Sequence, residues 1–514
     1  MQYTLQGQQG VRRIYRSLEH AFDRAFGGKL NPLKHLGSVA FMLFWLLAIT
    51  GAVLYVMLDT STAGAYGSIE AFSHETAIGS IVRSLHRYSA DGFIAIALAH
   101  LAREWLLGRF NGFRRFSWLT GVPLIPLAFV CAIGGFWLNW DRLGQYSAVA
   151  TAEWLDALPF LASPLARNFL GGAVSDRLFS LFVFVHLGVP LLLVFGLWFH
   201  IQRIARAEVF PPRALAVGTA LTLLGMALAL PVRSQGAADL GIVPGPLALD
   251  WWLLFIHPLT AATSPGLVWT LVLVALAGLF ALPFLRPRVP LAVAQVDPAH
   301  CNGCRRCVQD CPYGAIAMVP HPNGRRGVQL AQVDAALCAS CGICVGACPS
   351  STPFRGAQRL VTGIDMPQWP IDALRRRLES RLAAARGAPR FVVFGCDRGA
   401  RIDTLASRDT LAFSLACAGM LPPSFVEYAL RGGADGVVVA TCRDGGCEFR
   451  LGERWAAQRL NGEREPHLRR AVAADRWSHV GADAGDESAV RAALERLRRS
   501  ARTEPTSRRQ EALA

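Results

Sequence analysis

Cysteine is almost absent from the first 300 residues of this 514-residue chain. Cys131 stands alone there, and the other twelve of the 13 cysteines follow. An oxidised extracellular domain would spread its cysteines to crosslink loops, so this distribution indicates a reducing compartment. The sequence also lacks a glycine-rich nucleotide-binding loop, a flavin motif and a Rieske ligand pattern. We therefore expect the oxidation of an organic substrate to belong to a separate partner.

Acidic residues are also scarce: 37 Asp and Glu stand against 52 Lys and Arg, a formal net charge of +15, although 52% of the residues are hydrophobic. One soluble globule would not combine these properties, whereas apolar membrane spans flanked by cytoplasmic Arg clusters would. Residues 1–35 are polar and basic without an apolar core, so no cleavable signal peptide is expected. Residues 461–514, rich in Ala and Arg, are predicted to form a solvated or partly helical basic tail. That stretch has no basic patch with interleaved aromatics, so nucleic acid is not an expected partner.

Six segments are apolar and long enough to cross a bilayer, for which about 20 residues suffice. They are roughly 36–58, 81–107, 118–138, 177–203, 214–232 and 266–286. Fifteen basic residues flank the spans on one side: Arg12, Arg13, Arg16, Arg24, Lys29, Lys34, Arg103, Arg109, Arg114, Arg115, Arg203, Arg206, Arg213, Arg286 and Arg288. The other side has five: Arg83, Arg142, Arg167, Arg177 and Arg233. The positive-inside rule then predicts a multi-pass protein of a prokaryotic inner membrane, with both termini in the cytoplasm.

The pattern changes after the sixth span. A Pro-containing linker at 287–296 leads to a segment at 297–355 that is dense in Cys, Gly and Pro. Residues 371–386 are predicted to form a charged linker helix, and from 390 to 460 short apolar runs alternate with helical segments. The predicted fold is thus multidomain: a six-span α-helical membrane bundle, an α+β segment, and a small α/β domain with a parallel sheet.

Four histidines share one spacing within the predicted membrane spans. His86 and His100 lie in the second span, His186 and His200 in the fourth, and each pair is fourteen residues apart. Fourteen residues are nearly four helical turns, so both histidines of a pair share a face and lie roughly 21 Å apart along the axis. Two such helices facing each other form two His–His sites, each suited to a six-coordinate b-type haem iron.

Glycine repeats the same spacing. Gly37 and Gly51 in the first span, and Gly121 and Gly135 in the third, are also fourteen residues apart. Because glycine has no side chain, these positions are expected to let two flat macrocycles approach the helix backbone at matching depths. A shared spacing at eight positions is hard to explain by ordinary helix packing alone.

The stretches RSLHRYSADGFIAIALAHLAR and RLFSLFVFVHLGVPLLLVFGLWFHIQR closely resemble the cytochrome b subunit of quinol:cytochrome c oxidoreductases. This resemblance implies a di-haem four-helix core at 36–210, followed by two further membrane helices at 211–290. By the same resemblance, His86 and His186 hold the outer haem, and His100 and His200 hold the inner one. Arg83 and Arg103 match positions that pair with haem propionates in the family.

Two segments resemble the family's outer quinone site. GFWLNWDRLGQYS has Asn139 where the family has Pro, and LDWWLLF has Asp250 at the place of the Glu in the Pro-Glu-Trp-Tyr motif. An acid at Asp250 would accept a quinol proton. An interfacial Trp belt with a loop carboxylate is an equally good reading, so the outer site stays open here. His35 stands where a covalent third haem needs Cys, so two haems are expected.

Two complete C-x₂-C-x₂-C-x₃-C-P runs lie at 301–312 and 338–349. Thiolates at this spacing hold cubane clusters, and the fourth Cys of each run ligates the other cluster. One [4Fe–4S] centre is therefore predicted on Cys301, Cys304, Cys307 and Cys348, and the other on Cys338, Cys341, Cys344 and Cys311. The segment resembles bacterial two-cluster ferredoxins.

Four cysteines remain, Cys396, Cys417, Cys442 and Cys447, and the first three directly follow predicted strands. The carboxyl ends of parallel strands share one sheet edge, where four thiolates would suit a [2Fe–2S] cluster. Zinc and unrelated free thiols are the alternatives. CAGMLPPSFVEYALRGGADGVVVATCRDGGC resembles the delta subunit of methyl-viologen-reducing hydrogenases, which implies a partner of the hydrogenase or heterodisulfide reductase type.

These observations predict an oxidoreductase subunit that carries electrons between a cytoplasmic partner and membrane quinone. Expected partners are membrane lipid, quinone, a soluble hydrogenase-, heterodisulfide reductase- or dehydrogenase-like protein, and a second copy through the cytochrome b part. Two competing functions stay open: a membrane-anchored thiol or disulfide reductase, and an assembly scaffold for a redox complex.

Overall fold

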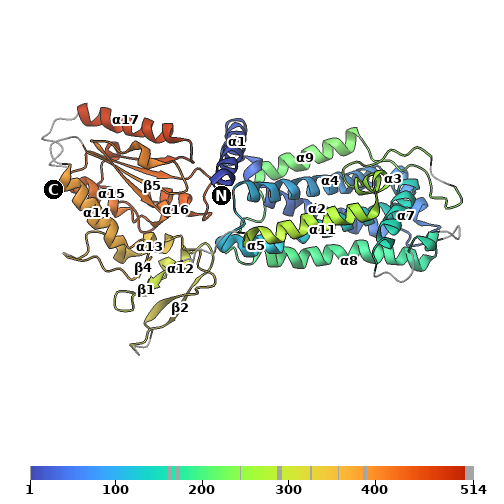
Figure 1. Ribbon diagram of the computed structural model, residues 1–514, viewed down its shortest axis with the longest axis horizontal. Coiled ribbons are helices and arrows are strands. Elements are labelled where there is room, and N and C mark those ends of the chain that lie inside the picture. Colours follow the sequence, from blue (N-terminus) through green and yellow to red (C-terminus); the bar gives the residue numbers. More distant parts are fainter. Residues whose placement is uncertain are drawn as a thin grey trace. The chain divides into compact units, whose positions relative to one another are not determined.

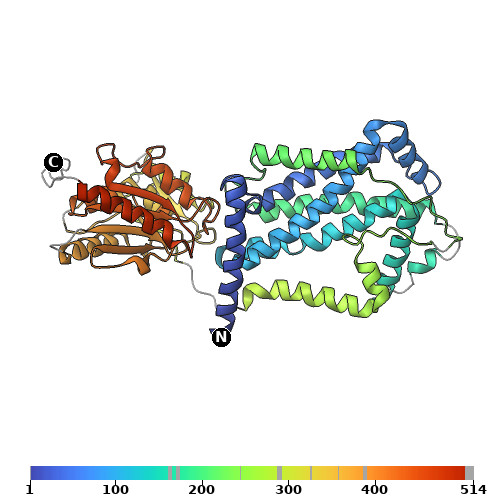
Figure 2. The ribbon, with the colours of Figure 1, turned by 90° about the horizontal axis from the view of Figure 1, so that it is seen from above.

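A computed structural model describes residues 2–159, 165–169, 174–205, 207–242, 245–285, 292–323, 327–356, 358–385 and 390–503. Residues 287–291 of the predicted linker and 504–514 of the predicted tail lie outside the described residues. The chain divides into two compact units (Figures 1 and 2), one built mainly from residues 30–285 and the other from residues 292–503. We call them the membrane unit and the cysteine unit and describe each by itself.

The membrane unit is helical. After α1 (Gln2–Phe26), its helices are α2 (Leu36–Met57), α3 (Ala65–Glu75), α4 (Ala77–Leu106), α5 (Arg115–Gly121), α6 (Leu124–Asn139), α7 (Arg142–Asp156), α8 (Asp176–Ile201), α9 (Arg213–Ala229), α10 (Ile256–Ala262) and α11 (Pro265–Ala281). Helix α2 packs along α4, as Figure 1 shows, and helix α6 packs along α8. Buried Leu43 and Phe44 of α2 fill the centre, so the bundle has an apolar interior.

Hydroxyl caps fix where three of the long helices begin. Thr76 accepts a hydrogen bond from the Gly79 amide at 2.9 Å at the start of α4. Ser175 caps α8 and Ser264 caps α11 in the same way. Each side-chain oxygen satisfies one of the amides that the first turn of a helix leaves without a partner.

Four helices among the described residues are long and apolar enough to cross a membrane: Leu36–Met57, Gly112–Asn139, Asp176–Ile201 and Pro265–Phe284. The second and fifth predicted spans coincide with α4 and α9. Helix α4 carries Arg83, Arg87, Asp91, Arg103 and Glu104, and α9 has only 17 residues. The helical membrane part is thus confirmed, while six spans stay a prediction.

The cysteine unit begins with two small antiparallel pairs. Strands β2 (Ile316–Pro320) and β3 (Gln329–Val333) form a hairpin, and β1 (Gln295–Val296) pairs with β4 (Ile364–Asp365). Two short helices, α12 (Arg306–Gln309) and α13 (Ile343–Ala347), lie within the two cysteine runs.

The second half of the cysteine unit is a parallel sheet in the order β6 (Thr410–Leu415), β5 (Phe391–Cys396), β7 (Gly436–Thr441), β8 (Trp477–Gly481). The predicted parallel sheet is therefore confirmed. Val392 and Phe394 face a core shared with α14 (Ile371–Ala384) and α15 (Ser424–Arg431), while Phe391 and Val393 face α17 (Glu487–Thr503). Figure 1 shows the sheet between these helices.

The prediction of a basic tail from residue 461 is wrong for the described part. Strand β8 extends the sheet, and α17 buries Val490, Ala493, Leu494 and Leu497 against it. These apolar residues recur at helical spacing on one face, while the Arg residues of α17 occupy the others. The parallel-sheet domain thus continues to about residue 503.

The predicted linker helix is also part of the core. Leu374, Leu378 and Leu382 of α14 are buried in the same hydrophobic cluster as Val345 of the ferredoxin-like segment and Val392 of the sheet. Their spacing of four residues places them on one face of the helix. The two iron–sulfur-type segments therefore share one core instead of being joined by a solvated spacer.

Leu494→Ala tests whether α17 belongs to the fold. Leu494 is 2% exposed, and deleting a buried Leu side chain costs about 3 kcal/mol. We expect a lower midpoint of thermal unfolding for the cysteine unit, whereas exposed Arg491→Ala on the same helix should leave it unchanged. Equal melting of the two variants would show that α17 does not stabilise the domain.

Candidate metal centres

The four histidines meet as two pairs across helices α4 and α8. The ring centres of His86 and His186 are 6.3 Å apart with an interplanar angle of 69°, and those of His100 and His200 are 6.5 Å apart at 86°. Two metal–nitrogen bonds of about 2 Å each, plus the distance from each nitrogen to its ring centre, span roughly 6 Å. Both pairs therefore fit one six-coordinate iron between two imidazoles.

Each of the four glycines faces one of these imidazoles. A Cβ on Gly51 would lie 3.0 Å from Cε1 of His86, and one on Gly135 would lie 3.0 Å from Cε1 of His186. The corresponding distances are 3.4 Å for Gly37 to His100 and 2.8 Å for Gly121 to His200. The shared spacing thus has a direct meaning in the fold: α2 makes room for the histidines of α4, and α5 and α6 make room for those of α8.

Three imidazoles are held through their Nδ1 atoms. Thr50 Oγ1 lies 3.0 Å from His86 Nδ1, and Thr120 Oγ1 lies 3.4 Å from His200 Nδ1. His186 Nδ1 lies 2.9 Å from the carbonyl oxygen of Cys131. A partner at Nδ1 fixes the ring orientation and leaves Nε2 for a metal. Sequence reasoning missed both threonines, although each directly precedes the glycine that faces the same histidine.

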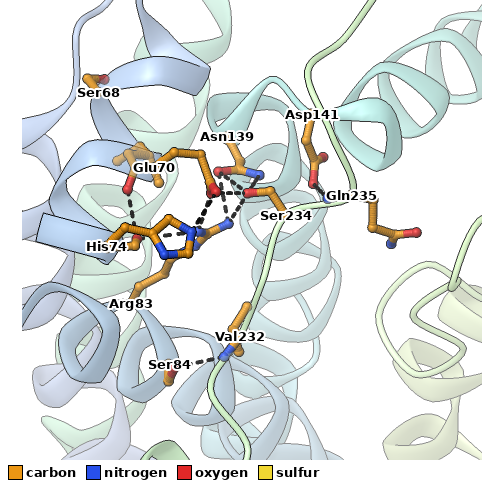
Figure 3. A network of polar contacts seen from close by, with 12 residues as sticks. Ser68, Glu70, His74, Arg83, Ser84, Asn139, Asp141, Val232, Ser234 and Gln235 are labelled. Atoms are coloured by element: carbon orange, nitrogen blue, oxygen red, sulfur yellow. Dashed lines mark hydrogen bonds and ion pairs between the residues drawn. The ribbon is translucent and has the colours of Figure 1, made fainter. Parts of the chain in front are cut away.

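Arg83 lies in a closed polar network at one end of the bundle (Figure 3). Its guanidinium donates to Glu70 at 2.7 Å and to Asn139 at 3.1 Å, and Ser234 accepts at 2.5 Å. Ser234 in turn donates to Glu70 at 2.5 Å, and exposed His74 lies 3.2 Å from the other oxygen of that carboxylate. The network ties α3, α4, α6 and the segment after α9 together. Arg83 as a haem propionate partner stays a prediction.

The second predicted propionate partner also has a carboxylate beside it. Arg103 Nη1 lies 3.2 Å from Glu104, whose oxygens also meet Arg109 at 3.7 Å and Arg114 at 3.3 Å. Three guanidinium groups thus gather around one carboxylate. Guanidinium groups bind carboxylates, so the residues present fit the predicted role.

Asp250 has several partners. One oxygen accepts hydrogen bonds from the backbone amides of Trp252 at 2.9 Å and Leu253 at 2.7 Å, and the other forms an ion pair with Arg87. Arg87 also bonds Asp91 at 2.8 Å. Donors of this kind hold the carboxylate in a fixed position. The geometry explains Asp250 as the cap of a turn, and its catalytic role stays a prediction.

The first predicted cubane ligand set lines one cavity. Cys301, Cys304, Cys307 and Cys348 all border it. Burial raises the pKa of the Cys307 thiol to about 12, and the neighbouring thiols of Cys348, Cys304 and Cys301 add to that rise. Four thiols around one cavity are the donor set that a [4Fe–4S] cluster needs.

The second predicted set, Cys311, Cys338, Cys341 and Cys344, also gathers in space. Burial raises the pKa of Cys341 to about 12, with Cys311 and Cys338 as neighbouring causes. Both cysteine runs use left-handed backbone at matching positions: Gly303 (φ 67°) and Arg305 (64°) in the first, Ser340 (59°) and Gly342 (70°) in the second. The same left-handed conformation thus recurs at the same positions of both cysteine runs.

The last four cysteines meet at the carboxyl edge of the parallel sheet. The sulfur atoms of Cys396 and Cys442 are 3.7 Å apart, and the Cys417 sulfur lies within hydrogen-bonding reach of Cys396 and Cys447. All four residues are buried. A Cβ on Gly452, the first residue of α16 (Gly452–Leu460), would overlap Cys417 Sγ and lie 3.3 Å from Cys447 Sγ. Sequence reasoning missed this glycine.

In the part of the chain that the structure describes, no group of three or more His, Cys, Asp or Glu side chains has the arrangement of a single bound metal ion. The ligand assignments for the histidines and the three cysteine sets therefore stay predictions that the observed proximities support.

Comparisons with known proteins divide the chain in the same way. Residues 22–207 match the family model of cytochrome b/b6/petB, residues 300–352 that of the 4Fe-4S dicluster domain, and residues 405–500 that of the methyl-viologen-reducing hydrogenase delta subunit. The predicted resemblances are confirmed in this order. A cytochrome b part implies haem, and a dicluster part implies [4Fe–4S] clusters, so the chain combines the features of a membrane electron-transfer protein.

One solved structure similar to this chain is described as "Hyperthermophilic respiratory Complex III". It aligns with a TM-score of 0.41 and 20% sequence identity, over 49% of this chain and 75% of that one.

Gly121→Leu tests the glycine–imidazole contact. A side chain at Gly121 would overlap the ring of His200, so we expect about one of two haems to be lost, as measured chemically and in the dithionite-reduced optical spectrum. Gly188→Leu on α8 is the matched control, because nothing lies within 4 Å of the Cβ position there. Full haem content in Gly121→Leu would contradict the pairing.

Cys442→Ser tests the third cysteine set. The parent protein should contain roughly ten non-haem irons with matching sulfide, and the variant roughly eight, because one [2Fe–2S] cluster is lost. Cys131→Ser, which touches none of the three sets, should keep the parent value. Loss of about one zinc instead of iron would favour the zinc alternative.

Proposed function

We propose that this protein carries electrons between a soluble cytoplasmic redox partner and membrane quinone. The two histidine pairs would hold two b haems, the two ferredoxin-type sets two [4Fe–4S] clusters, and the last set one [2Fe–2S] cluster. When bound, each of these groups takes up and releases single electrons. The protein's own residues would supply the ligands and fix the distances between them.

The observation that carries this proposal is the unbroken series of cysteine sets in the cysteine unit. Helix α13, which carries Cys344 of the second set, packs against α12, which carries Cys307 of the first. The side chain of Ile343, next to Cys344, and the Cys447 sulfur of the third set both lie within 4 Å of the Cβ position of Gly452. Each set therefore has a member next to the following set. A protein that used its clusters separately would have no need for this contiguity.

Burial distinguishes this function from thiol or disulfide reduction. Cys396, Cys417, Cys442 and Cys447 are at most 4% exposed. A reductase needs a reactive thiolate that its disulfide substrate can reach. Four buried sulfur atoms packed against one another support a bound cluster better than an exchanging thiol.

The proposed direction of electron flow rests on two arguments: the side of the membrane on which the cysteine unit lies, and the reduction potentials of the centres. Fifteen basic flanking residues against five support a cytoplasmic position for the cysteine unit. Ferredoxin-type centres reach potentials near −400 mV in some classes, so transfer from them toward haem and quinone is downhill. The opposite flow would need energy from the membrane potential, about 2.3 kcal/mol per charge per 100 mV.

Truncation after residue 290 tests the route. Membranes with the full-length protein should transfer electrons from reduced viologen to quinone, with the haems reduced on the way. The truncated protein should lose this activity, because the cysteine unit is the proposed path, while added quinol should still reduce its haems. Unchanged viologen-to-quinone transfer after truncation would show that electrons do not pass through the cysteine unit.

A further inference from the structure

A buried ion pair joins the two halves of the cysteine unit. Arg459, on α16, has the largest fully buried side chain among the described residues, with 1% of it exposed. Its Nη2 contacts the carboxylate of Asp310, which is equally enclosed in the ferredoxin-like half and directly precedes Cys311. Two oppositely charged groups, one from each half, are thus removed from water together.

The rest of the guanidinium faces backbone next to two cysteine sets. Nη1 donates to the carbonyl oxygen of Gly419 at 2.8 Å, and Nη2 reaches the carbonyl oxygen of Ile343 at 3.5 Å. Gly419 is two residues past Cys417 of the third set, and Ile343 directly precedes Cys344 of the second. The Nε atom has no hydrogen-bond partner among the described residues. The cation therefore lies between the second and third sets.

The charged side chains in contact at Asp310 have a net positive charge. Arg464 also bonds Asp310, at 2.5 Å, so two guanidinium groups share one carboxylate. Arg464 differs in exposure: 24% of its side chain is accessible, against 1% for Arg459. Water and salt screen an exposed charge far more than a buried one, so Arg459 acts more strongly on its surroundings.

Packing alone does not explain a buried arginine. Apolar side chains of similar volume often stabilise a protein as well as a buried ion pair does, because the pair loses its hydration. The charge is therefore expected to have a use beyond holding the two halves together. Reduction adds negative charge to an iron–sulfur cluster, and cluster potentials depend on nearby charge and hydrogen bonds.

We propose that Arg459 is a positioning and potential-setting residue for electron transfer. It clamps the second and third cysteine sets against each other, and its buried charge raises the reduction potentials of the centres at both. This inference rests on the proposed function, since it requires iron–sulfur clusters at these sets.

The test is Arg459→Met in the full-length protein, with redox titration of each iron–sulfur signal by EPR. We expect the reduction equilibria of the second and third centres to shift about tenfold toward the oxidised form, which is about 59 mV for a one-electron couple. The centre at Cys301, Cys304, Cys307 and Cys348 and both haems should keep their potentials. Arg459→Lys, which keeps the charge, should restore most of the parent values, and Arg464→Gln should shift them less.

Asp310→Asn separates an electrostatic role from a structural one. Asp310→Asn removes negative charge beside Arg459, so the reduction potentials of the second and third centres should rise. If the ion pair only held the two sets together, Arg459→Met and Asp310→Asn would shift these potentials in the same direction. Shifts of the same sign, or unchanged potentials with intact iron content, would overturn the inference alone. If Arg459→Met loses iron, two other results test the inference. They are the sign of the potential shift in Asp310→Asn and the recovery of the parent potentials in Arg459→Lys. A parent protein without iron–sulfur signals would overturn the proposed function itself, and this inference with it.

Discussion

The membrane unit depends on the contact between glycine and imidazole. In a bilayer the helices gain little from hydrophobic association, so close packing and small residues decide how near two helices come. Gly51 and Gly135 would each place a Cβ 3.0 Å from a histidine ring, tighter than ordinary contact. The absence of four side chains thus sets both the helix separation and the position of the rings. The neighbouring threonines then orient two of those rings.

Much of this arrangement is predictable from the sequence, because helical geometry is regular. A spacing of fourteen determines which residues of one helix share a face, so two His–His sites follow from the spacing. The pairing of His86 with His186 and of His100 with His200 comes from the resemblance to cytochrome b. The contacts of Thr50 and Asp250 cannot be predicted from this spacing. A threonine in an apolar span bonds its own helix as readily as a neighbour, and the Asp250 partner Arg87 comes from a segment far away in the chain.

The boundaries within the cysteine unit are harder to predict for a different reason. Composition suggests a solvated tail and a linker helix, since Arg dominates both α14 and α17 by count. Whether each of these helices packs into the domain core depends on where its few apolar side chains lie. Leu374, Leu378 and Leu382 form one stripe, and Val490, Leu494 and Leu497 form another. A narrow apolar stripe suffices when a sheet covers it, while the long Arg side chains extend from the rim into water.

One short segment links the three cysteine sets. Residues 338–344 supply three thiols of the second set. The helix that carries Cys344 packs against the helix that carries Cys307, and Ile343 lies beside Gly452, whose Cβ position is 3.3 Å from Cys447 Sγ. Ile343 is fully buried, and its side chain packs near Gly419 and Gly452. A bulkier residue at either glycine would push this segment away from the third set. The close backbone packing that forms the shared core therefore also limits how near the three sets can come. Small residues at Gly419 and Gly452 are thus required both for stability and for electron transfer between the sets.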